Sequence, residues 1–357
     1  MYEMVRICTS QRCAYELDWL PGFSGLLTRN TTVNPYSCVY LLRHISQATI
    51  LNIRQGCEFY SIMDSMIKIA THNGGFHTDD VFAVATLQLV HGTENVEIIR
   101  TRDEAVLTNA DVVVDVGGVY DVETKRFDHH QIGGPVRDNG IPYAAFGLVW
   151  REYGEAVTGS KEVADEIERA LVLAVDAGDS GVSLYELKNS DIPPFELYQV
   201  TRSFLPEWGS VKNKDEAFFE AVTFARALLS RIIVKKQAEQ KMKELIAETY
   251  KNTADKRVLV FDRAVSTGPC VEYPEVLLVV SPDESENGQW IVSTVRKDYN
   301  TFAGRVRFPE AWGGLRDEEL SAASGIADAV FCHKGGFIFV AGSKEGALEA
   351  VESILRD

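Results

Sequence analysis

Four of the seven histidines in this chain lie in two short segments that also contain aspartates. The first segment reads HNGGFHTDD and starts at His72, and the second reads DHH and starts at Asp128. Imidazole nitrogens mixed with carboxylate oxygens suit Mn²⁺, Fe²⁺ or Zn²⁺, and a carboxylate-rich position also suits Mg²⁺. These residue types therefore predict a site for divalent metal ions.

In the first segment, His72, His77 and Asp79 are the predicted metal ligands, and Asp80 is a further candidate for a ligand or its support. The alternative is an ordinary turn from a strand into a helix, with Asp79 stabilising the helix N-terminus through the helix dipole. Two histidines and two carboxylates within nine residues exceed what such a turn requires. The metal interpretation is therefore favoured.

Asp115 ends an otherwise apolar run, DVVVDV, and is followed by Gly117 and Gly118. A buried carboxylate is costly unless it is hydrogen-bonded, neutralised or bound to a metal. It could accept hydrogen bonds from amides of the glycine turn. Its two oxygens could also bridge two cations about 3.5–4 Å apart, the spacing of two-metal hydrolytic sites. We predict the bridging role.

Asp128, His129 and His130 follow a predicted strand within RFDHHQ. Adjacent side chains of an extended segment point to opposite faces, so both histidines should not bind one ion. We assign His129 to the metal and His130 to the phosphate or leaving group. Asp128 would contact the site or orient an imidazole. A polar surface run is the weaker alternative.

A fourth pair of acids, Asp176 and Asp179, follows a helical pattern in AVDAGDSG. Aspartate is unfavourable at a helix C-terminus, where the dipole is negative, so one of the two is expected to be a ligand. Asp176 lies nearer the apolar helix and is the first choice, with Asp179 as the second.

The elements that must position these residues alternate between strand and helix. Strands are predicted at residues 67–71, 96–100, 111–116 and 125–128, and helices at residues 79–90, 103–107, 143–153 and 161–175. This alternation indicates an α/β fold with a parallel sheet flanked by helices. The carboxyl ends of parallel strands meet at one edge of a sheet, where ligands bind. The three His/Asp clusters should therefore converge there.

The whole chain divides into four predicted regions. Residues 1–65, which contain four of the six cysteines and no lysine, are expected to form a poorly ordered extension. Residues 66–190 form the metal-binding catalytic domain, and residues 191–255 form a helical linker region. Residues 256–357 form a smaller C-terminal α+β domain that binds substrate. Its expected strands are residues 257–262, 276–281, 290–296 and 337–341, with helices at 317–324 and 344–355.

Composition limits the partners and the compartment. The formal net charge of −16 argues against a broad basic face that wraps duplex DNA. No apolar run is long enough for a transmembrane helix, so no membrane partner is expected. The cysteines form no CxxC pair, which favours free thiols and a cytoplasmic location. The assembly is left open, with a homodimer among the alternatives.

The motifs in this order resemble those of the melanocyte-proliferating-gene (Myg) family of the DHH phosphoesterase superfamily. The matching stretches are IATHNGGFHTDD, EIIRTRD, DVVVDVGGVYD, RFDHHQ, WGGLRDEELSAASGI and HKGGFI. The resemblance covers residue 66 to the end. The superfamily usually has aspartate where this chain has His77. In this chain the spacing from the preceding ligand is one residue longer, so the ligand at that place differs.

The resemblance implies a DHH-type catalytic domain, a C-terminal substrate domain and a metal-dependent nuclease or phosphodiesterase activity on RNA. Glycines let backbone amides approach phosphate, and arginines grip it bidentately. The resemblance favours the GGLR segment and His333 as substrate-binding. All candidates in this domain are Arg296, Arg305, Gly313, Gly314, Arg316, His333, Gly335 and Gly336.

The sequence thus predicts two-metal hydrolysis of phosphodiester bonds, with Mn²⁺ favoured over Mg²⁺. A 3′-to-5′ exonuclease acting on RNA or short oligonucleotides is the leading interpretation by resemblance. The alternatives are a phosphatase of nucleotides or polyphosphate, and a non-catalytic binding protein with a structural metal.

Overall fold

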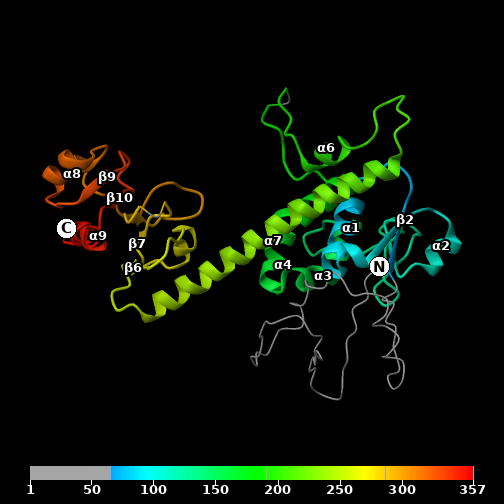
Figure 1. Cartoon of the computed structure of the whole chain (residues 1–357), viewed down its shortest axis with the longest axis horizontal. Helices are drawn as coiled ribbons and strands as arrows, with labels where there is room; N and C mark the ends of the chain where they lie inside the picture. Colours follow the sequence, from blue (N-terminus) through cyan, green and yellow to red (C-terminus); the bar gives the residue numbers. More distant parts are fainter. Residues whose placement is uncertain (1–65, 190, 286, 357) are drawn as a thin grey trace, which may run out of the picture. The chain divides into compact units, whose positions relative to one another are not determined.

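The computed structural model describes residues 66–189, 191–285 and 287–356. The extension predicted for residues 1–65 lies outside this described part. Two five-stranded sheets with flanking helices form a mixed α/β architecture, as the sequence predicted. Figure 1 follows the chain from the first sheet, through a long helix, into the second sheet.

The first sheet is predominantly parallel and has the strand order β2-β1-β3-β5-β4. β1, β2, β3 and β5 are parallel neighbours, whereas β4 is antiparallel to β5. The edge strand β4 was not predicted. The strands are β1 (Ile67–Thr71), β2 (Val96–Arg100), β3 (Val112–Val114), β4 (Tyr120–Asp121) and β5 (Arg126–Phe127).

Helices pack against this sheet through a core that contains Phe76, Phe82, Phe127 and Phe146. α4, a π-helical turn η3 and α5 follow one another without a break, so the predicted helix of residues 161–175 continues to Asp179. The elements are α1 (Thr78–His91), η2 (Thr93–Asn95), α2 (Glu104–Asn109), α3 (Ala145–Thr158), α4 (Lys161–Ile167), η3 (Glu168–Val172), α5 (Leu173–Asp179) and α6 (Leu197–Arg202).

A single helix, α7 (Lys214–Asn252), takes part in two hydrophobic cores. Phe218, Leu229 and Ile233 belong to the core of the first sheet. Ile246 instead packs in a core with Leu259 and other residues of the C-terminal domain. α7 is therefore part of both domains as well as the connection between them.

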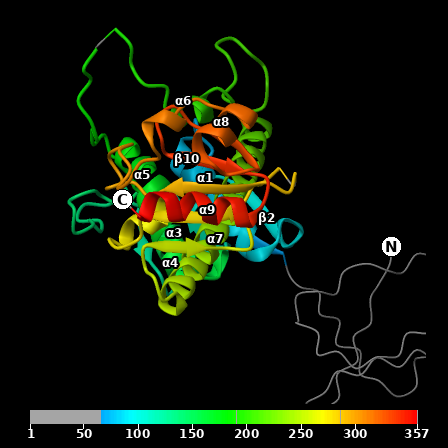
Figure 2. The same cartoon turned by 90° about the vertical axis from the view of Figure 1, so that its left-hand side faces the viewer.

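The second sheet has the order β6-β7-β8-β10-β9, with β6 parallel to β7 and the other neighbours antiparallel. Figure 2 shows α9 along this sheet. β9 was not predicted. The elements are β6 (Val258–Val260), η4 (Gly268–Glu272), β7 (Leu278–Pro282), β8 (Trp290–Thr294), η5 (Glu310–Trp312), α8 (Asp317–Ser324), β9 (Ala329–Cys332), β10 (Ile338–Ala341) and α9 (Lys344–Leu355).

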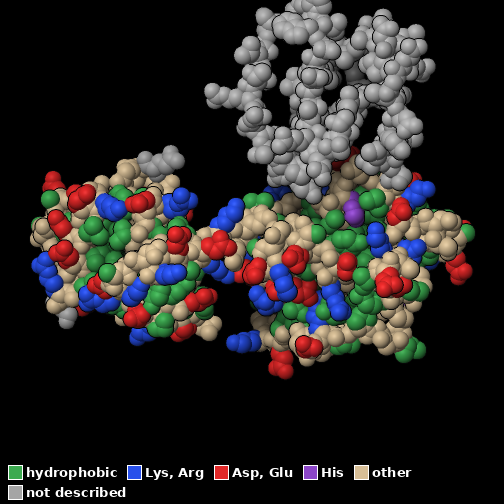
Figure 3. All heavy atoms as spheres, turned by 90° about the horizontal axis from the view of Figure 1, so that it is seen from below, with side chains coloured by type: hydrophobic (Ala, Val, Ile, Leu, Met, Phe, Trp, Pro, Cys, Tyr) green, Lys and Arg blue, Asp and Glu red, His purple; other side chains and the backbone are tan. Residues whose placement is uncertain are grey.

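The described surface mixes charges of both signs. In Figure 3, Lys and Arg side chains are interspersed with Asp and Glu side chains on the face in view. Within the described ranges, no helix has both the length and the apolar composition that a membrane crossing requires. Cys270 and Cys332 are buried free thiols, and neither forms a disulfide.

Candidate metal centre

Asp115 joins two histidines that come from different strands. It directly follows β3, and its φ of 55° turns the chain sharply at the sheet edge. Its Oδ2 lies 3.2 Å from Nε2 of His72, and its Oδ1 lies 3.2 Å from Nε2 of His129. His72 follows β1 and His129 comes shortly after β5, and β1 and β5 flank β3 in the sheet. The parallel strand order therefore brings the three residues to one edge.

His72 is buried and also contacts Asp80, with 3.1 Å between Nε2 and Oδ2. The Gly74 N–H donates to its Nδ1 over 3.1 Å, which orients the ring with Nε2 between the two carboxylates. Burial lowers the pKa of His72, but the hydrogen bonds to Asp115 and Asp80 outweigh it and raise the pKa to about 9. The raised pKa reflects how strongly the carboxylates attract positive charge at this nitrogen.

His129 connects Asp115 to a second set of acids. Its Nε2 lies 3.3 Å from Oδ2 of Asp179 and 3.7 Å from Oδ2 of Asp79. The other oxygen of Asp179 lies 3.4 Å from Nδ1 of His77, the residue before α1. Asp79 is buried in the first turn of α1, and its Oδ2 accepts from the Ala145 N–H at the start of α3. The N-termini of α1 and α3 thus both favour negative charge here.

The pKa values of the aspartates at this site are shifted in opposite directions. Burial raises the pKa of Asp79, and the nearby charges of Asp115 and Asp179 raise it further. Burial also raises the pKa of Asp115, but hydrogen bonds from His129 and His72 outweigh it and hold the pKa at about 2. The unequal pKa values arise because four carboxylates share one edge of the sheet.

The residues fit a divalent cation. In the described part of the chain, Oδ1 of Asp79 is buried without a hydrogen-bond partner. Oδ2 of Asp80 and Oδ1 of Asp115 face only imidazole nitrogens, of His72 at 3.1 Å and of His129 at 3.2 Å. Leaving such oxygens without a partner is costly, and a bound cation would remove that cost. Three groups have ligand atoms within 4.8 Å of one another: His72–Asp80–Asp115, Asp115–His129–His130 and His77–Asp79–Asp179. We call them the three His/Asp groups.

Asp128 orients the turn that presents the two adjacent histidines. Its Oδ1 accepts from the backbone N–H of His129 and from the ring nitrogen Nδ1 of His130, each over 2.7 Å. Its Oδ2 accepts from the Gly118 N–H. The His130 side chain is 62% exposed, whereas that of His129 is only 14% exposed. His130 is therefore accessible to a substrate, and its Nδ1 lies 3.6 Å from Asp115.

The two acids of α5, Asp176 and Asp179, have different partners in the structure. Asp179 belongs to one of the three His/Asp groups, and Asp176 belongs to none of them. Oδ2 of Asp176 instead forms a 2.7 Å ion pair with Arg137, and Oδ1 accepts from the Gly147 N–H. Burial raises the pKa of Asp176 to about 7, although Arg137 opposes that shift. Arg137 gave no sequence signal, since it is a single arginine in a Gly/Pro-rich loop.

Six of the candidates in the C-terminal domain lie together. The Gly314 N–H donates to the Cys332 carbonyl, one residue before His333, and the Gly336 N–H donates to the His333 carbonyl. An added Cβ at Gly313 would lie 3.1 Å from the carbonyl oxygen of the residue before Gly335. The guanidinium of Arg316 lies 4.4 Å from the ring centre of Phe331 on β9.

Two other arginines do not belong to this cluster. Arg305 uses its guanidinium to donate to the backbone carbonyls of Val271, Tyr273 and Val276. Those bonds fix a loop and engage two of the three guanidinium nitrogens, which makes Arg305 less available for the predicted contact with substrate. Arg296 lies beside Phe302, 6.0 Å from the ring centre, and its backbone pairs with Gly304.

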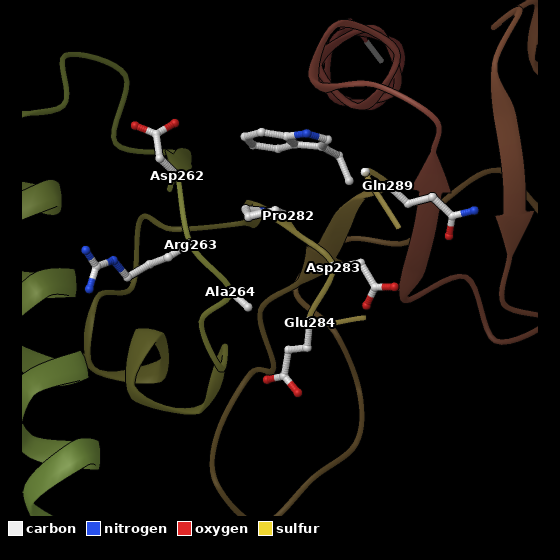
Figure 4. A pocket seen from close by; sticks show the side chains of 9 residues that line it. Asp262, Arg263, Ala264, Pro282, Asp283, Glu284 and Gln289 are labelled. Carbon is white, nitrogen blue, oxygen red and sulfur yellow. The ribbon is translucent and has the colours of Figure 1, made fainter. Parts of the chain in front are cut away.

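A separate pocket lies at the β7–β8 end of the second sheet. Figure 4 shows its lining, which includes Asp262, Asp283 and Glu284 and one arginine, Arg263. Because three carboxylates and only one guanidinium line this pocket, it would disfavour the binding of a polyanion. The pocket contains none of the predicted substrate-binding residues, so we do not assign the substrate to it.

Comparison with known proteins gives one family. Residues 68–355 match the family model MYG1_exonuc, which is described as an uncharacterised protein family (UPF0160). The MYG1 protein of Schizosaccharomyces pombe is 31% identical over 322 residues, covering 82% of this chain and 98% of that protein. The human MYG1 exonuclease is 29% identical over 330 residues, covering 81% and 85%.

The similarity extends to bacteria. The MYG1 protein of Chlamydia pneumoniae is 31% identical over 296 residues, covering 81% of this chain and 97% of that protein. Among solved structures, an exopolyphosphatase-related protein from Bacteroides fragilis aligns with 11% identity and a TM-score of 0.21. That alignment covers 82% of this chain and 92% of the other.

Proposed function

Since the chain belongs to the MYG1_exonuc family, we propose that it is a metal-dependent phosphoesterase that hydrolyses phosphodiester bonds. Relatives from human, mouse, rat and cow are named MYG1 exonuclease. The proposed activity is 3′-to-5′ exonuclease action on RNA or short oligonucleotides.

One observation supports the proposal above the others: the Asp115 carboxylate lies between His72 and His129, and the buried Asp79 beside it has one oxygen without a partner in the described part of the chain. A two-oxygen ligand at this place can serve two ions. His72 and Asp80 would hold one ion with Asp115, and His77, Asp79, Asp179 and His129 would hold the other. Imidazoles and carboxylates together favour Mn²⁺, with Mg²⁺ as the alternative.

Bound divalent ions would activate a water molecule and offset negative charge on the phosphoryl oxygens. The chain's own residues would do the rest. His130 is exposed beside Asp115, and its Nδ1 is engaged by Asp128, so the rest of its ring is available to the phosphate or leaving group. Asp128 holds that ring and the backbone before it.

Substrate phosphates would bind in the C-terminal domain. Gly313, Gly314, Gly335 and Gly336 lie together with His333, and their own N–H groups donate within the protein, so these glycines would shape the surface while side chains bind the phosphate. Arg316 makes no ion pair in the described part of the chain, so its guanidinium is available for an anion.

The test is a comparison of substrates with one variant and one control. Purified protein is incubated with Mn²⁺ and 5′-labelled RNA, in parallel with nucleotides and pyrophosphate. We expect stepwise shortening of the RNA, and loss of that activity by at least about 100-fold in Asp115→Asn. The exposed Asp138→Asn serves as the matched control and should cleave normally.

Release of orthophosphate without strand shortening would favour a phosphatase. No turnover of any substrate, together with tight Mn²⁺ binding, would indicate a non-catalytic binding protein. Unchanged cleavage by Asp115→Asn would exclude the proposed centre.

A further inference from the structure

Arg137 is a buried arginine in the loop that follows the Asp128–His130 turn. Its side chain is only 7% exposed, and its donors reach three different elements. Nε donates to Glu168 in the π-helical turn over 2.6 Å, and NH2 donates to Asp176 in α5 over 2.7 Å. NH1 donates to the Pro142 carbonyl in its own loop over 3.1 Å. Each of the three guanidinium nitrogens therefore has a hydrogen-bond partner.

The start of α3 completes this arrangement. α3 has Ala144 at its N-cap, which provides no side-chain cap. The Gly147 N–H instead donates to Oδ1 of Asp176 over 3.0 Å. A Cβ added at Gly147 would lie 1.8 Å from Oδ2 of Asp176 and 2.5 Å from NH2 of Arg137. Position 147 thus lacks a side chain because the ion pair occupies that space.

The ion pair lies one helical turn from a predicted metal ligand. Asp176 and Asp179 are three residues apart on α5, so they lie on the same side of the helix. Asp176 is fixed by Arg137, and Asp179 points to His77 and His129. Arg137 also lies only seven residues after His130 along the chain. One guanidinium therefore links the loop after the two histidines to the helix that provides Asp179.

We propose that Arg137 is a positioning residue that holds Asp179 in place for the metal ion of the His77–Asp79–Asp179 group. This inference rests on the proposed metal-dependent function. Without the guanidinium, Asp176 would be a buried carboxylate with no counter-charge, and the first turn of α5 would move to hydrate it. Such a movement changes the place of Asp179 but not the contacts of His72 with Asp80 and Asp115.

The experiment measures Mn²⁺ binding to the metal-free full chain by electron paramagnetic resonance of free Mn²⁺. We expect two bound ions in the wild type. In Arg137→Gln, we expect one ion to bind about 10–100-fold more weakly, the usual effect of losing a residue that supports a ligand, while the other keeps its affinity. Arg137→Lys should restore part of the loss. Asp138→Asn, next to it in sequence and exposed, should bind as the wild type does.

Thermal unfolding of the same metal-free samples distinguishes a role of Arg137 in positioning Asp179 from a role in stability alone. A lower melting temperature in Arg137→Gln with two ions bound at wild-type affinity would overturn the inference. If Arg137→Gln does not fold, the double variant Arg137→Gln/Asp176→Asn replaces it, because it removes the fully buried charge that would lose its partner and leaves only Glu168, whose side chain is 24% exposed. The double variant should fold, and its affinity for one of the two Mn²⁺ ions should be lower than that of the wild type. Wild-type affinity for both ions would overturn the inference.

Failure of the proposed function would look different. A wild-type chain that binds no Mn²⁺ would exclude both the proposed function and the role of Arg137. Asp115→Asn provides the positive comparison, because the two oxygens of Asp115 face His72 and His129, one histidine from each proposed ion site. Asp115→Asn should lower the affinity for both Mn²⁺ ions, whereas Arg137→Gln should lower the affinity for one.

Discussion

Asp128 is a residue whose contribution can be tested apart from the metal ligands. It accepts hydrogen bonds from Gly118 N, His129 N and the His130 ring. Asp128→Asn keeps the size but puts an amide NH2 where one carboxylate oxygen accepts. We expect kcat to fall about 10–100-fold, with a smaller change in KM, because the histidines lose their orientation. Steady-state cleavage assays would measure this, and an unchanged kcat would contradict the orienting role.

His91 should make stability depend on pH. It ends α1 beside Tyr153, and its Nε2 is buried without a partner in the described part of the chain. Burial lowers its pKa below 6.5, and Lys125 lowers it further. The folded protein then binds fewer protons than the unfolded chain below pH 6.5, so this residue makes stability fall as the pH drops. His91→Gln should therefore show a smaller loss of melting temperature between pH 7.5 and 5.5.

The wild type and His91→Gln would be compared by calorimetry at both pH values. The other histidines are present in both proteins, so their titration cancels in the difference. An equal loss of melting temperature in the two proteins would contradict the prediction.

At single residues, the sequence was informative where a charge ended an apolar strand. His72, Asp115 and His129 could be placed together because their strands had to be parallel neighbours. The choice between Asp176 and Asp179 depended on Arg137, which is distant in sequence and has no motif. The contacts of Arg305 could not be foreseen for a similar reason, since its backbone partners lie about thirty residues earlier and cannot be recognised without the fold.

At the scale of elements, Arg100 links the His72 loop to the start of α7. It ends β2, and its side chain is 1% exposed. One amino group donates to the Gly74 carbonyl, and the other forms a 2.7 Å ion pair with Asp215 in the first turn of α7. The guanidinium also lies 4.6 Å from the ring centre of Phe218. A planar group with several donors is needed to make all three contacts.

Arg100→Lys should therefore disturb the loop. A single ammonium cannot reach both Gly74 and Asp215 in the same geometry, so we expect Mn²⁺ affinity to fall several-fold and the melting temperature to drop. Asp215→Asn is the matched control, because Asp215 is 46% exposed and its charge should contribute less than about 1 kcal/mol. Equal Mn²⁺ affinity in Arg100→Lys and Asp215→Asn would contradict a role for Arg100 at the loop.

Most elements could be predicted from their apolar patterns. The predicted helices at residues 317–324 and 344–355 coincide with α8 and α9. β4 and β9 were missed, although β5 and β10, which are equally short, lie within predicted strands, so length alone does not explain the difference. The helix predicted to end at residue 175 continues through Asp179, because Asp176 is neutralised by Arg137 and no longer opposes the helix there.

At the scale of the whole molecule, the continuity of α7 is the feature to test. Residues up to Ile233 belong to the first core, and Ile246 belongs to another. Ala238 lies between them on an exposed face. Proline at this place removes a helix hydrogen bond and costs about 3 kcal/mol, whereas glycine costs about 1 kcal/mol. We expect Ala238→Pro to cleave RNA poorly but to bind two Mn²⁺ ions normally.

Ala238→Gly is the control and should retain most of the activity. Loss of Mn²⁺ binding in Ala238→Pro would mean that the metal centre depends on the second half of the helix. Full cleavage by Ala238→Pro would mean that substrate hydrolysis does not need an unbroken α7.

The left-handed backbone of Asp115 has a consequence for evolution of this fold. A φ of 55° is unfavourable for any residue with a Cβ, by roughly 1–2 kcal/mol, and aspartate tolerates it better than most. Glycine at position 115 would remove that conformational penalty, so Asp115→Gly should melt at a higher temperature than Asp115→Ala. Selection for stability alone would therefore favour glycine at this position. Selection for catalytic activity would keep aspartate at position 115. In relatives that have lost the activity, glycine should therefore be a common replacement at this position.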